Sequence, residues 1–432
     1  MLIFYNVIQI LGLIVFAPLL FVKIILTPKY RGRILKRLGI GLEKNANRNP
    51  WSRPRIWIHA LSLGEVSSSK ALVRELRKDF PQATIFFSAA TGTGEKFARA
   101  VLEKDVDLFV PFPIDIFWSV RRVMRWVEPD VFVLVETDFW PNFLALLKQR
   151  NIPALLVNGR ISEKSFTRYR RLRWIFLPLF ASFRFISMQT EADAGKMVSL
   201  GVEADRVFSL GNLKYDSAVP GPVGRHEKID WSNAGVPSER TILVAGSTHP
   251  GEEEIIFEVY KRLVRDFPDL FLAIAPRKVE RSSEIVKCAE SSGLSAFLRT
   301  RPVPKPCDVM VLDTLGELNA FYEICDIAFV GGSLVQEGGH NPLEPAVFGK
   351  PVVFGTSMDD FSEVSQGLLR AGGGAVVGGA EQLYDLLRDW LLDKSLRHSL
   401  GGKAQAFVQQ HQGGAVRHVE LVRRILQKER KE

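Results

Sequence analysis

Short apolar runs alternate with amphipathic runs twice along this chain of 432 residues. In the first half the pattern predicts strands at residues 55–60, 84–90, 106–112, 131–136, 152–158 and 185–190. In the second half it predicts strands at residues 241–247, 270–277, 308–313, 326–333 and 351–355. Strands that alternate with helices form parallel sheets covered by helices on both faces. The chain is also long enough for two domains of ordinary size.

A segment rich in proline, glycine and charge separates the two halves. Residues 218–240 read AVPGPVGRHEKIDWSNAGVPSER, which is typical of a linker. We therefore predict two doubly wound α/β domains that face a cleft, over residues 28–217 and 241–432. Residues 382–432 have a helical pattern. The last helix packs either on the second domain or back on the first. In sheets of this kind, ligands bind at the carboxyl ends of the strands.

Charge is concentrated near the N-terminus. Residues 1–22 carry no charged side chain, whereas residues 23–55 hold ten Lys or Arg against one Glu, which equals the net charge of the whole chain, +9. This placement argues against a nucleic-acid-binding protein, whose basic residues would be spread over a reading surface. It predicts a membrane anchor at residues 1–27, with everything after it in the cytoplasm. Asn6, Gln9 and Pro18 interrupt the apolar run. The alternative to a membrane-spanning anchor is therefore a helix that lies in the membrane interface or packs on the folded protein.

Three strand ends of the first domain carry polar residues with two possible roles each. Glu65 follows the strand at 55–60 at the start of a helix, where it is either a base or an ordinary first-turn acid. A helix dipole is expected to keep its carboxylate ionised. Glu136 ends another apolar strand, and Lys214 ends this half; the two either meet a ligand or pair with each other. The turn at residues 91–94 has the shape of an anion site but lacks the ending of a P-loop.

One further segment of the first domain is both basic and aromatic. Residues 158–174 read NGRISEKSFTRYRRLRW, and residues 166–180 have the pattern of a single helix. The segment is either a solvated helix face or a site for an anionic, amphiphilic molecule.

Polar residues are denser at the strand ends of the second domain. Arg277 suits a phosphate or a carboxylate, and the run FVGGSLVQEGGHNPLEP joins glycine turns to polar side chains. The candidate positions at these ends are Ser247, Thr248, His249, Gly316, Glu317, Leu318, His340, Asn341 and Glu344. Cys288, Cys307 and Cys325 have no metal-ligand spacing, and no Asp-rich motif is present, so we predict neither a disulfide framework nor a metal site.

These motifs, in this order, resemble the 3-deoxy-D-manno-octulosonic acid (Kdo) transferases of lipopolysaccharide synthesis. The shared segments are WIHALSLGEV, VETDFWPN, NGRIS, GNLKYD, AGSTHPGEE, APR, LGEL and FVGGSLVQEGGHNPLEP, which span nearly the whole chain. The resemblance implies a GT-B glycosyltransferase, without a cofactor, at the cytoplasmic face of the bacterial inner membrane. It would transfer Kdo from CMP-Kdo to a lipid A precursor. Asp138 and Lys278 stand where Glu and His are common in the family.

The resemblance also implies roles for individual residues. Glu65 would be the catalytic base, and Glu136 and Lys214 would stabilise the transition state. The CMP-contacting positions would be Pro276, Arg277, Gly316, Glu317, Leu318, Asn341, Pro342, Leu343 and Glu344. Two alternatives stay open: another GT-B transferase of the same pathway that uses a UDP-sugar, and a membrane-bound scaffold without catalysis.

Overall fold

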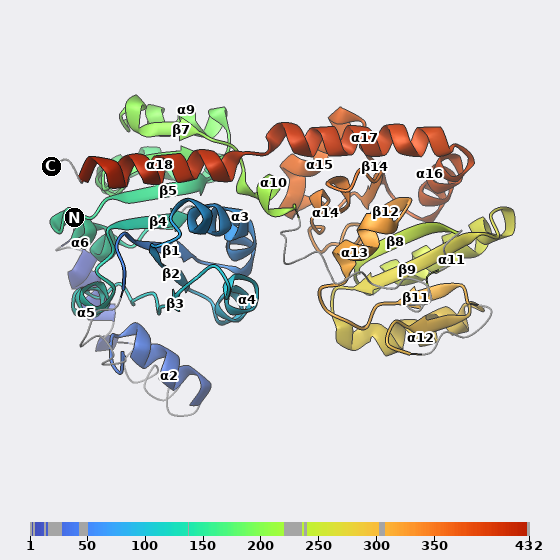
Figure 1. Ribbon diagram of the computed structural model, residues 1–432, viewed down its shortest axis with the longest axis horizontal. Coiled ribbons are helices and arrows are strands. Elements are labelled where there is room, and N and C mark those ends of the chain that lie inside the picture. The colour runs from blue at the N-terminus through green and yellow to red at the C-terminus, as the bar shows by residue number, and fades with distance from the viewer. Residues whose placement is uncertain are drawn as a thin grey trace. The chain divides into compact units, whose positions relative to one another are not determined.

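The structure of the chain is a computed structural model that describes residues 2, 5–12, 14–15, 28–42, 51–136, 138–219, 236, 240–301 and 307–429. The chain divides into two compact units (Figure 1). Unit 1 holds Met1–Ser217 and Gln412–Glu432, and unit 2 holds Ala218–His411. Most of the predicted linker, residues 218–240, lies outside the described residues.

Unit 1 is built on a parallel sheet of seven strands in the order β3-β2-β1-β4-β5-β6-β7. The strands are β1 (Arg55–Ala60), β2 (Thr84–Ala89), β3 (Leu108–Phe109), β4 (Val131–Val135), β5 (Ala154–Gly159), β6 (Phe183–Met188) and β7 (Val207–Ser209). The helices are α2 (Pro28–Arg37), α3 (Leu63–Asp79), α4 (Gly92–Leu102), α5 (Phe117–Val127), α6 (Pro141–Gln149), α7 (Glu163–Arg171), α8 (Arg173–Phe180), α9 (Glu191–Ser199), α10 (Leu213–Ser217) and α18 (Gly414–Glu429).

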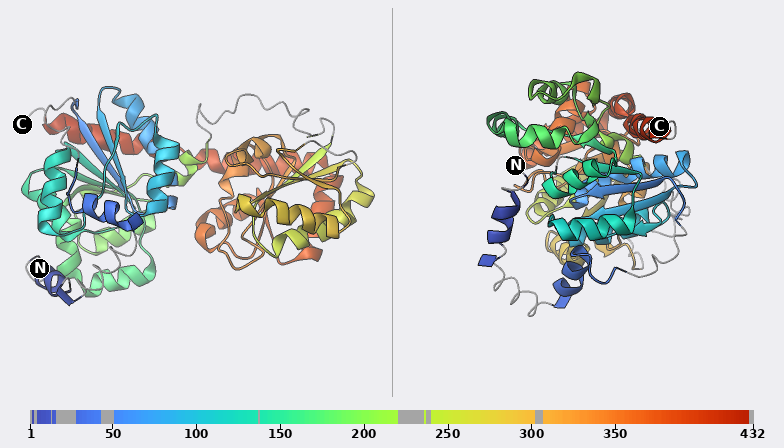
Figure 2. Two further views of the ribbon diagram at one scale, coloured as in Figure 1. Left: turned by 90° about the horizontal axis from the view of Figure 1, so that it is seen from below. Right: turned by 90° about the vertical axis from the view of Figure 1, so that its left-hand side faces the viewer.

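The central strands of unit 1 are apolar on both faces, so each face supports its own core. Trp57 of β1 belongs to a core that includes residues of α5, α6, α8 and α9, while its neighbours Ile56 and Ile58 belong to a core that includes residues of α3, α4 and α18. Figure 2 shows helices on both faces of this sheet. Asp216 of α10 joins α18 to this unit by accepting the backbone N–H groups of Gly413 and Ala415 at 2.6 and 3.0 Å.

Unit 2 repeats the same plan with a second parallel sheet, in the order β10-β11-β9-β8-β12-β13-β14. Its strands are β8 (Thr241–Thr248), β9 (Leu270–Pro276), β10 (Ala296–Leu298), β11 (Val309–Val311), β12 (Ile327–Val330), β13 (Val352–Gly355) and β14 (Gly374–Val377). Its helices are α11 (Glu252–Asp266), α12 (Ser282–Ser291), α13 (Leu318–Ile324), α14 (Leu343–Ala346), α15 (Ser362–Ala371), α16 (Ala380–Leu392) and α17 (Lys394–His411).

Both sheets reverse their strand order at one place, and this place positions the polar residues. In unit 1 the neighbours β1 and β4 pair in parallel from Ile56 with Val131 to His59 with Leu134. In unit 2 the equivalent neighbours are β8 and β12. The connections from two such strands diverge, and the crevice left at their carboxyl ends is the usual ligand site of doubly wound sheets.

The predicted α/β architecture is confirmed, with differences at the edges of the sheets. The strand predicted at residues 106–112 shrinks to Leu108–Phe109, and the short strands β7, β10 and β14 were not predicted. The single helix predicted at residues 166–180 is wrong. The chain forms α7 and α8 instead, because Leu172 leaves helical geometry (φ −108°, ψ 34°).

The described part of the N-terminal segment is held to the rest of unit 1 by hydrogen bonds. Residues 5–12 are helical. The Tyr5 hydroxyl donates to the Asp115 carboxylate at 3.0 Å, and the Gln9 amide donates to the Asp115 carbonyl at 3.0 Å. Asn6 and Asn142 exchange two hydrogen bonds of 3.0 and 2.8 Å. The polar residues that interrupt the predicted anchor therefore serve as docking contacts.

No helix among the described residues combines the length and the apolar character needed to cross a membrane. The rest of the predicted anchor, residues 16–27, lies outside the described part of the chain.

Asp115 generates a prediction about the stability of unit 1. This residue is 3% exposed, and its carboxylate accepts the N–H groups of Asn142 and Phe143 at 3.0 and 2.8 Å, which caps α6. Asp115→Ala leaves these donors without a partner and should lower the free energy of unfolding by about 1–3 kcal/mol. Urea denaturation measures the loss. Glu103→Ala, at an exposed position of the same unit, should change it by less than about 0.5 kcal/mol; equal losses would contradict the capping role.

Candidate functional site

Glu65 lies in the first turn of α3, immediately after β1. The Ser62 hydroxyl donates to the Glu65 carboxylate at 3.2 Å and accepts the backbone N–H of Glu65 at 3.4 Å. The backbone N–H of Leu61 also donates to this carboxylate. These contacts form a variant of the capping box, so Glu65 helps to cap the N-terminus of α3. Helix capping fixes the side chain next to the crevice and does not exclude a chemical role.

The environment of Glu65 sets its pKa close to neutrality. Burial raises the pKa to about 7, and the negative charges of Glu136 and Asp138 add to the rise, while the donors on Leu61 and Ser62 oppose it. A helix dipole therefore does not keep this carboxylate fully ionised at neutral pH, since loss of hydration is the larger effect. A pKa near 7 suits a group that takes up a proton during a reaction.

Glu136 occupies the end of β4, across the strand-order reversal from Glu65. Its backbone is left-handed, with φ at 63°, a strained conformation that for a residue other than glycine concentrates at functional sites. Burial raises the pKa of Glu136, while the positive charges of Lys214 and Arg160 and a hydrogen bond from Asn158 lower it. The first unit thus brings together all three residues that the sequence singled out, Glu65, Glu136 and Lys214.

Two residues of this site had no assigned role in the sequence analysis. Arg160 and Asn158 both come from the NGRIS segment at the end of β5, next to β4 in the sheet. The sequence signal was a polar run after an apolar strand, the same signal that identified Glu136. We refer to Glu65, Glu136, Asp138, Arg160 and Lys214 as the acid-base cluster.

The basic-aromatic segment of unit 1 forms a surface pocket. Its volume is about 560 Å³, and it is lined by Arg171, Arg173, Trp174, Leu177, Pro178 and Ala181. Trp174 is 62% exposed. An exposed indole beside guanidinium groups suits a molecule that has both apolar and anionic parts.

In unit 2 the predicted residues lie at the carboxyl ends of β9, β11 and β12. Pro276 ends β9, and the backbone N–H of the exposed Arg277 donates to the Thr248 carbonyl at 3.0 Å. Gly316, Glu317 and Leu318 lead into α13, and Asn341, Pro342, Leu343 and Glu344 lead into α14. Because β11, β9, β8 and β12 are neighbours in that order, these segments share one edge of the sheet.

Some of these side chains are already engaged within the protein. The Glu317 carboxylate accepts hydrogen bonds from the Thr314 hydroxyl and from Arg299, the latter at 3.5 Å. The Asn341 amide oxygen accepts the backbone N–H of Leu343 at 3.2 Å. At Gly316 the backbone is left-handed, with φ at 90°, and an added side chain would meet open space. The α13 turn is therefore held by polar contacts, while its tip is sterically open.

Two histidines meet at the strand-order reversal of unit 2. The Nε2 atoms of His249 and His340 are 2.9 Å apart, and their rings stack with centroids at 5.1 Å. Burial, the charge of Arg277 and the neighbouring His249 together lower the pKa of His340 to about 4. Since the charge of Arg277 acts on His340, the segments that follow β9 and β12 lie near each other.

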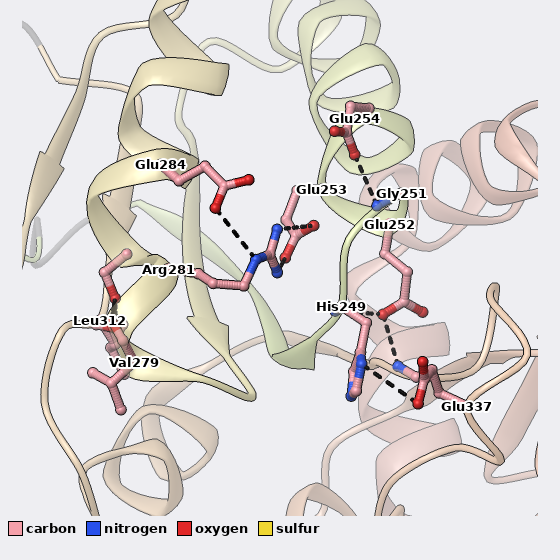
Figure 3. A network of polar contacts seen from close by, with 12 residues as sticks. His249, Gly251, Glu252, Glu253, Glu254, Val279, Arg281, Glu284, Leu312 and Glu337 are labelled. Atoms are coloured by element: carbon pink, nitrogen blue, oxygen red, sulfur yellow. Dashed lines mark hydrogen bonds and ion pairs between the residues drawn. The ribbon is translucent and has the colours of Figure 1, made fainter.

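A buried carboxylate that the sequence analysis did not single out shapes this part of unit 2. Glu252 has no exposed surface, and its carboxylate accepts the backbone N–H groups of His249, Gly332, Ser333 and Leu334 at 2.9, 2.7, 3.0 and 3.0 Å. Figure 3 shows Glu252 beside His249 at the start of α11. In the same view Arg281 lies between Glu253 and Glu284, with its Nη1 atom 2.9 Å from Glu253. Glu252 thus holds the glycine turn after β12 against the end of β8.

Within the described residues, no three His, Cys, Asp or Glu side chains are grouped in a way that could hold a metal ion.

Glu252 and its neighbour Glu254 provide a matched test. Glu252→Gln keeps the shape of the side chain but turns an N–H donor toward other N–H donors, so unit 2 should lose about 1–3 kcal/mol of stability. Glu254 is exposed, lies in the same turn of α11 and accepts the backbone N–H of Gly251 at 3.1 Å. Glu254→Gln should therefore lose much less. Thermal unfolding of both variants measures the difference, and similar melting temperatures would contradict the role of Glu252.

Comparisons with known proteins agree on one family. The family model described as 3-deoxy-D-manno-octulosonic-acid transferase (kdotransferase) matches residues 32–217. The 3-deoxy-D-manno-octulosonic acid transferase of Haemophilus influenzae is 33% identical over 417 residues, which cover 96% of this chain and 95% of that protein. The enzyme of the same name from Rickettsia bellii is 30% identical over 393 residues, 90% of each chain.

A solved structure supports the fold alone. The glycosyltransferase of kitacinnamycin covers 87% of this chain and 100% of its own, with a TM-score of 0.55 and 16% identity. The similarity in structure at such low identity agrees with a GT-B arrangement of two α/β units.

Proposed function

The chain belongs to the 3-deoxy-D-manno-octulosonic acid transferase family, and from that membership we propose a function for its two groups of polar residues. The protein is a glycosyltransferase that transfers Kdo in lipopolysaccharide synthesis. The donor is CMP-Kdo, the acceptor is a lipid A precursor, and CMP is released. Unit 1 binds the acceptor and unit 2 binds the donor.

Glu65 is the catalytic base of this proposal. The observation that carries it is a half-buried carboxylate of near-neutral pKa in the crevice at the end of β1. Glu65 takes the proton of an acceptor hydroxyl as that oxygen forms a bond to the anomeric carbon of Kdo. The bond from this carbon to the phosphate oxygen of CMP breaks, and its electron pair leaves with CMP.

Glu136 and Lys214 stabilise the transition state. The sugar gains positive charge as the bond to CMP breaks, and an ionised Glu136 offsets that charge. Lys214 and Arg160 lower the pKa of Glu136 against the effect of burial, which favours the ionised form that this role needs. Lys214 also offers a positive charge to the acidic groups of the donor.

The donor's nucleotide is assigned to the edge of unit 2. Arg277 binds the phosphate, and Pro276, Gly316, Leu318, Asn341, Pro342 and Leu343 contact CMP. Carboxylates are acceptors for ribose hydroxyls, so Glu317 and Glu344 are assigned to the ribose. The clustering of Arg277, His249 and His340 supports an anionic ligand here.

The acceptor and its membrane are assigned to unit 1. The pocket of α8, with its arginines and Trp174, suits the acylated and phosphorylated acceptor. Val7, Ile8, Ile10 and Leu11 of the N-terminal segment are about half exposed, and Ile14 and Val15 about two thirds. These apolar residues, followed by the basic run at 23–55, support association with the cytoplasmic face of the bacterial inner membrane.

A transfer assay tests the function as a whole. Wild-type protein is given CMP-Kdo, generated in the assay, and a tetra-acylated lipid A precursor, and the product mass is read. The expected result is a gain of one or more Kdo units. Transfer only from UDP-sugars would favour a different GT-B transferase, and lipid binding without turnover would favour a scaffold.

The pKa of Glu65 predicts the pH dependence of transfer. The base must be ionised, so kcat/KM should fall as the pH drops through about 7 and should level off above it. Glu65→Gln should abolish this limb together with nearly all activity, while CMP binding, assigned to unit 2, persists. A wild-type profile that stays flat down to pH 5 would contradict the assignment.

Arg277 is tested by binding alone. Arg277→Ala should weaken the affinity for CMP, measured by calorimetry, by about tenfold or more, because a charged hydrogen bond contributes roughly 1.5–3 kcal/mol. Lys278→Ala changes the adjacent exposed cation and serves as the control. Equal losses for the two variants would show that only the general charge matters.

A further inference from the structure

Asn158 is a fully buried amide at the end of β5, adjacent to β4 and therefore to Glu136. We propose that Asn158 is a positioning residue that holds the Glu136 carboxylate and the Lys214 turn in one fixed arrangement. The proposal rests on the roles proposed above for Glu136 and Lys214. It adds to them the device that places the two groups.

One side of the amide faces Glu136. The Nδ2 atom of Asn158 donates to Oε1 of Glu136 at 3.4 Å, and the backbone N–H of Glu136 donates to the Val157 carbonyl at 2.9 Å. Asn158 and Glu136 are both left-handed, with φ at 57° and 63°. Asparagine adopts this conformation several-fold more often than most residues, so the turn at the end of β5 suits it. A left-handed residue thus stands at the end of each of two adjacent strands, and the Asn158 amide meets the Glu136 carboxylate there.

The other side of the amide faces the turn that carries Lys214. The Oδ1 atom of Asn158 accepts the backbone N–H of Leu213, the first residue of α10, at 2.9 Å. The backbone carbonyl of Asn158 accepts a hydrogen bond from the side-chain amide of Gln189 at 3.0 Å. This single residue therefore contacts the Glu136 carboxylate, the residue that precedes Lys214 and a second buried amide.

A series of amides continues from Asn158 to Lys214. The side-chain oxygen of Gln189 accepts a hydrogen bond from the side-chain amide of Asn212 at 3.1 Å. The side-chain oxygen of Asn212 accepts the backbone N–H of Lys214 at 3.0 Å. Asn158, Gln189 and Asn212 are 0, 8 and 4% exposed. Buried polar side chains that are fully hydrogen-bonded rigidify their surroundings, because each broken bond would leave an unsatisfied group.

An amide suits both neighbours of this position. The Glu136 carboxylate needs a donor, and the Leu213 N–H needs an acceptor. Asparagine supplies both from one planar group, whereas an ionised aspartate supplies only acceptors and a leucine supplies neither. A protonated aspartate would again supply both a donor and an acceptor. In an Asn158→Asp variant, pH therefore controls whether the side chain at this position can replace the amide.

The charges around Glu136 decide where such a proton would reside. Lys214 from α10 and Arg160 from the β5 connection favour the ionised form of Glu136. Glu65 from α3 responds to the negative charges of Glu136 and of Asp138 on the β4 connection. In Asn158→Asp, two buried carboxyl groups face each other, so the pair keeps one proton between them to a higher pH than an ordinary aspartate would.

The experiment compares Asn158→Asp with wild type in the transfer assay across pH, well below the melting temperature. At the acid end, the protonated carboxyl should reproduce the amide and restore much of the activity that wild type has at the same pH. As pH rises and the proton is lost, the two carboxylates repel. The ratio of mutant to wild-type kcat should then fall by roughly a hundredfold. Asn158→Leu should be impaired at every pH, because it has no donor to regain.

Asn142→Asp is the matched control. Asn142 is also buried, at 4% exposure, but it bonds to Asn6 and to the Asp115 carbonyl rather than to Glu136. Its activity relative to wild type should not fall with rising pH in the same way. If the ratio for Asn158→Asp is flat or rises with pH, Asn158 is only a structural residue and the proposal is overturned.

A stability measurement separates failure of this proposal from failure of the proposed function. The pKa of the new carboxyl is raised in the folded protein, so its contribution to stability is present at low pH and is lost as pH rises through the folded pKa. The melting temperature of Asn158→Asp relative to wild type should therefore drop with rising pH even if the wild type transfers no Kdo. A pH-independent difference would contradict the contact with Glu136.

Discussion

The cost of burying a carboxylate controls both polar centres of this protein. Central strands of a parallel sheet are apolar on both faces, so polar side chains are confined to the strand ends. At those ends a carboxylate loses hydration and must be compensated by donors or by positive charge, or its pKa rises. Glu65, Glu136 and Glu252 all stand next to the strand-order reversals of the two sheets, and each is compensated differently.

The degree of compensation separates structural from chemical roles. Glu252 accepts four backbone N–H groups and holds a turn. Glu65 accepts fewer donors and feels two other acids, so its pKa rises to about 7 and it can exchange a proton. Burial raises the pKa of Glu136, and the positive charges of Lys214 and Arg160 limit that rise. One residue type thus serves as a structural brace at Glu252, as the proposed base at Glu65 and as the proposed stabiliser of positive charge at Glu136, according to its neighbours.

The sequence predicted the strands and their polar ends because both depend on local pattern. The run RIWIHA is β1 to the residue, and Glu65, Glu136 and Arg277 lie at strand ends as expected. The sequence could not predict the partners of these residues. Asn158, Gln189 and Asn212 are far apart in the chain and meet only through the order of the strands, and Glu252 finds Gly332 some eighty residues away. The break between α7 and α8 at Leu172 was also hidden, because the apolar pattern runs through it.

The most direct test of this account is the pKa of the Glu65 carboxyl itself. NMR titration of protein labelled with carbon-13 at the glutamate carboxyls, with Glu65→Gln to assign the signal, measures this pKa without any substrate. The account predicts a midpoint at about 7. A midpoint near the ordinary glutamate value of about 4.3 would contradict it, because Glu65 would then be a hydrated helix-capping acid and not a buried base.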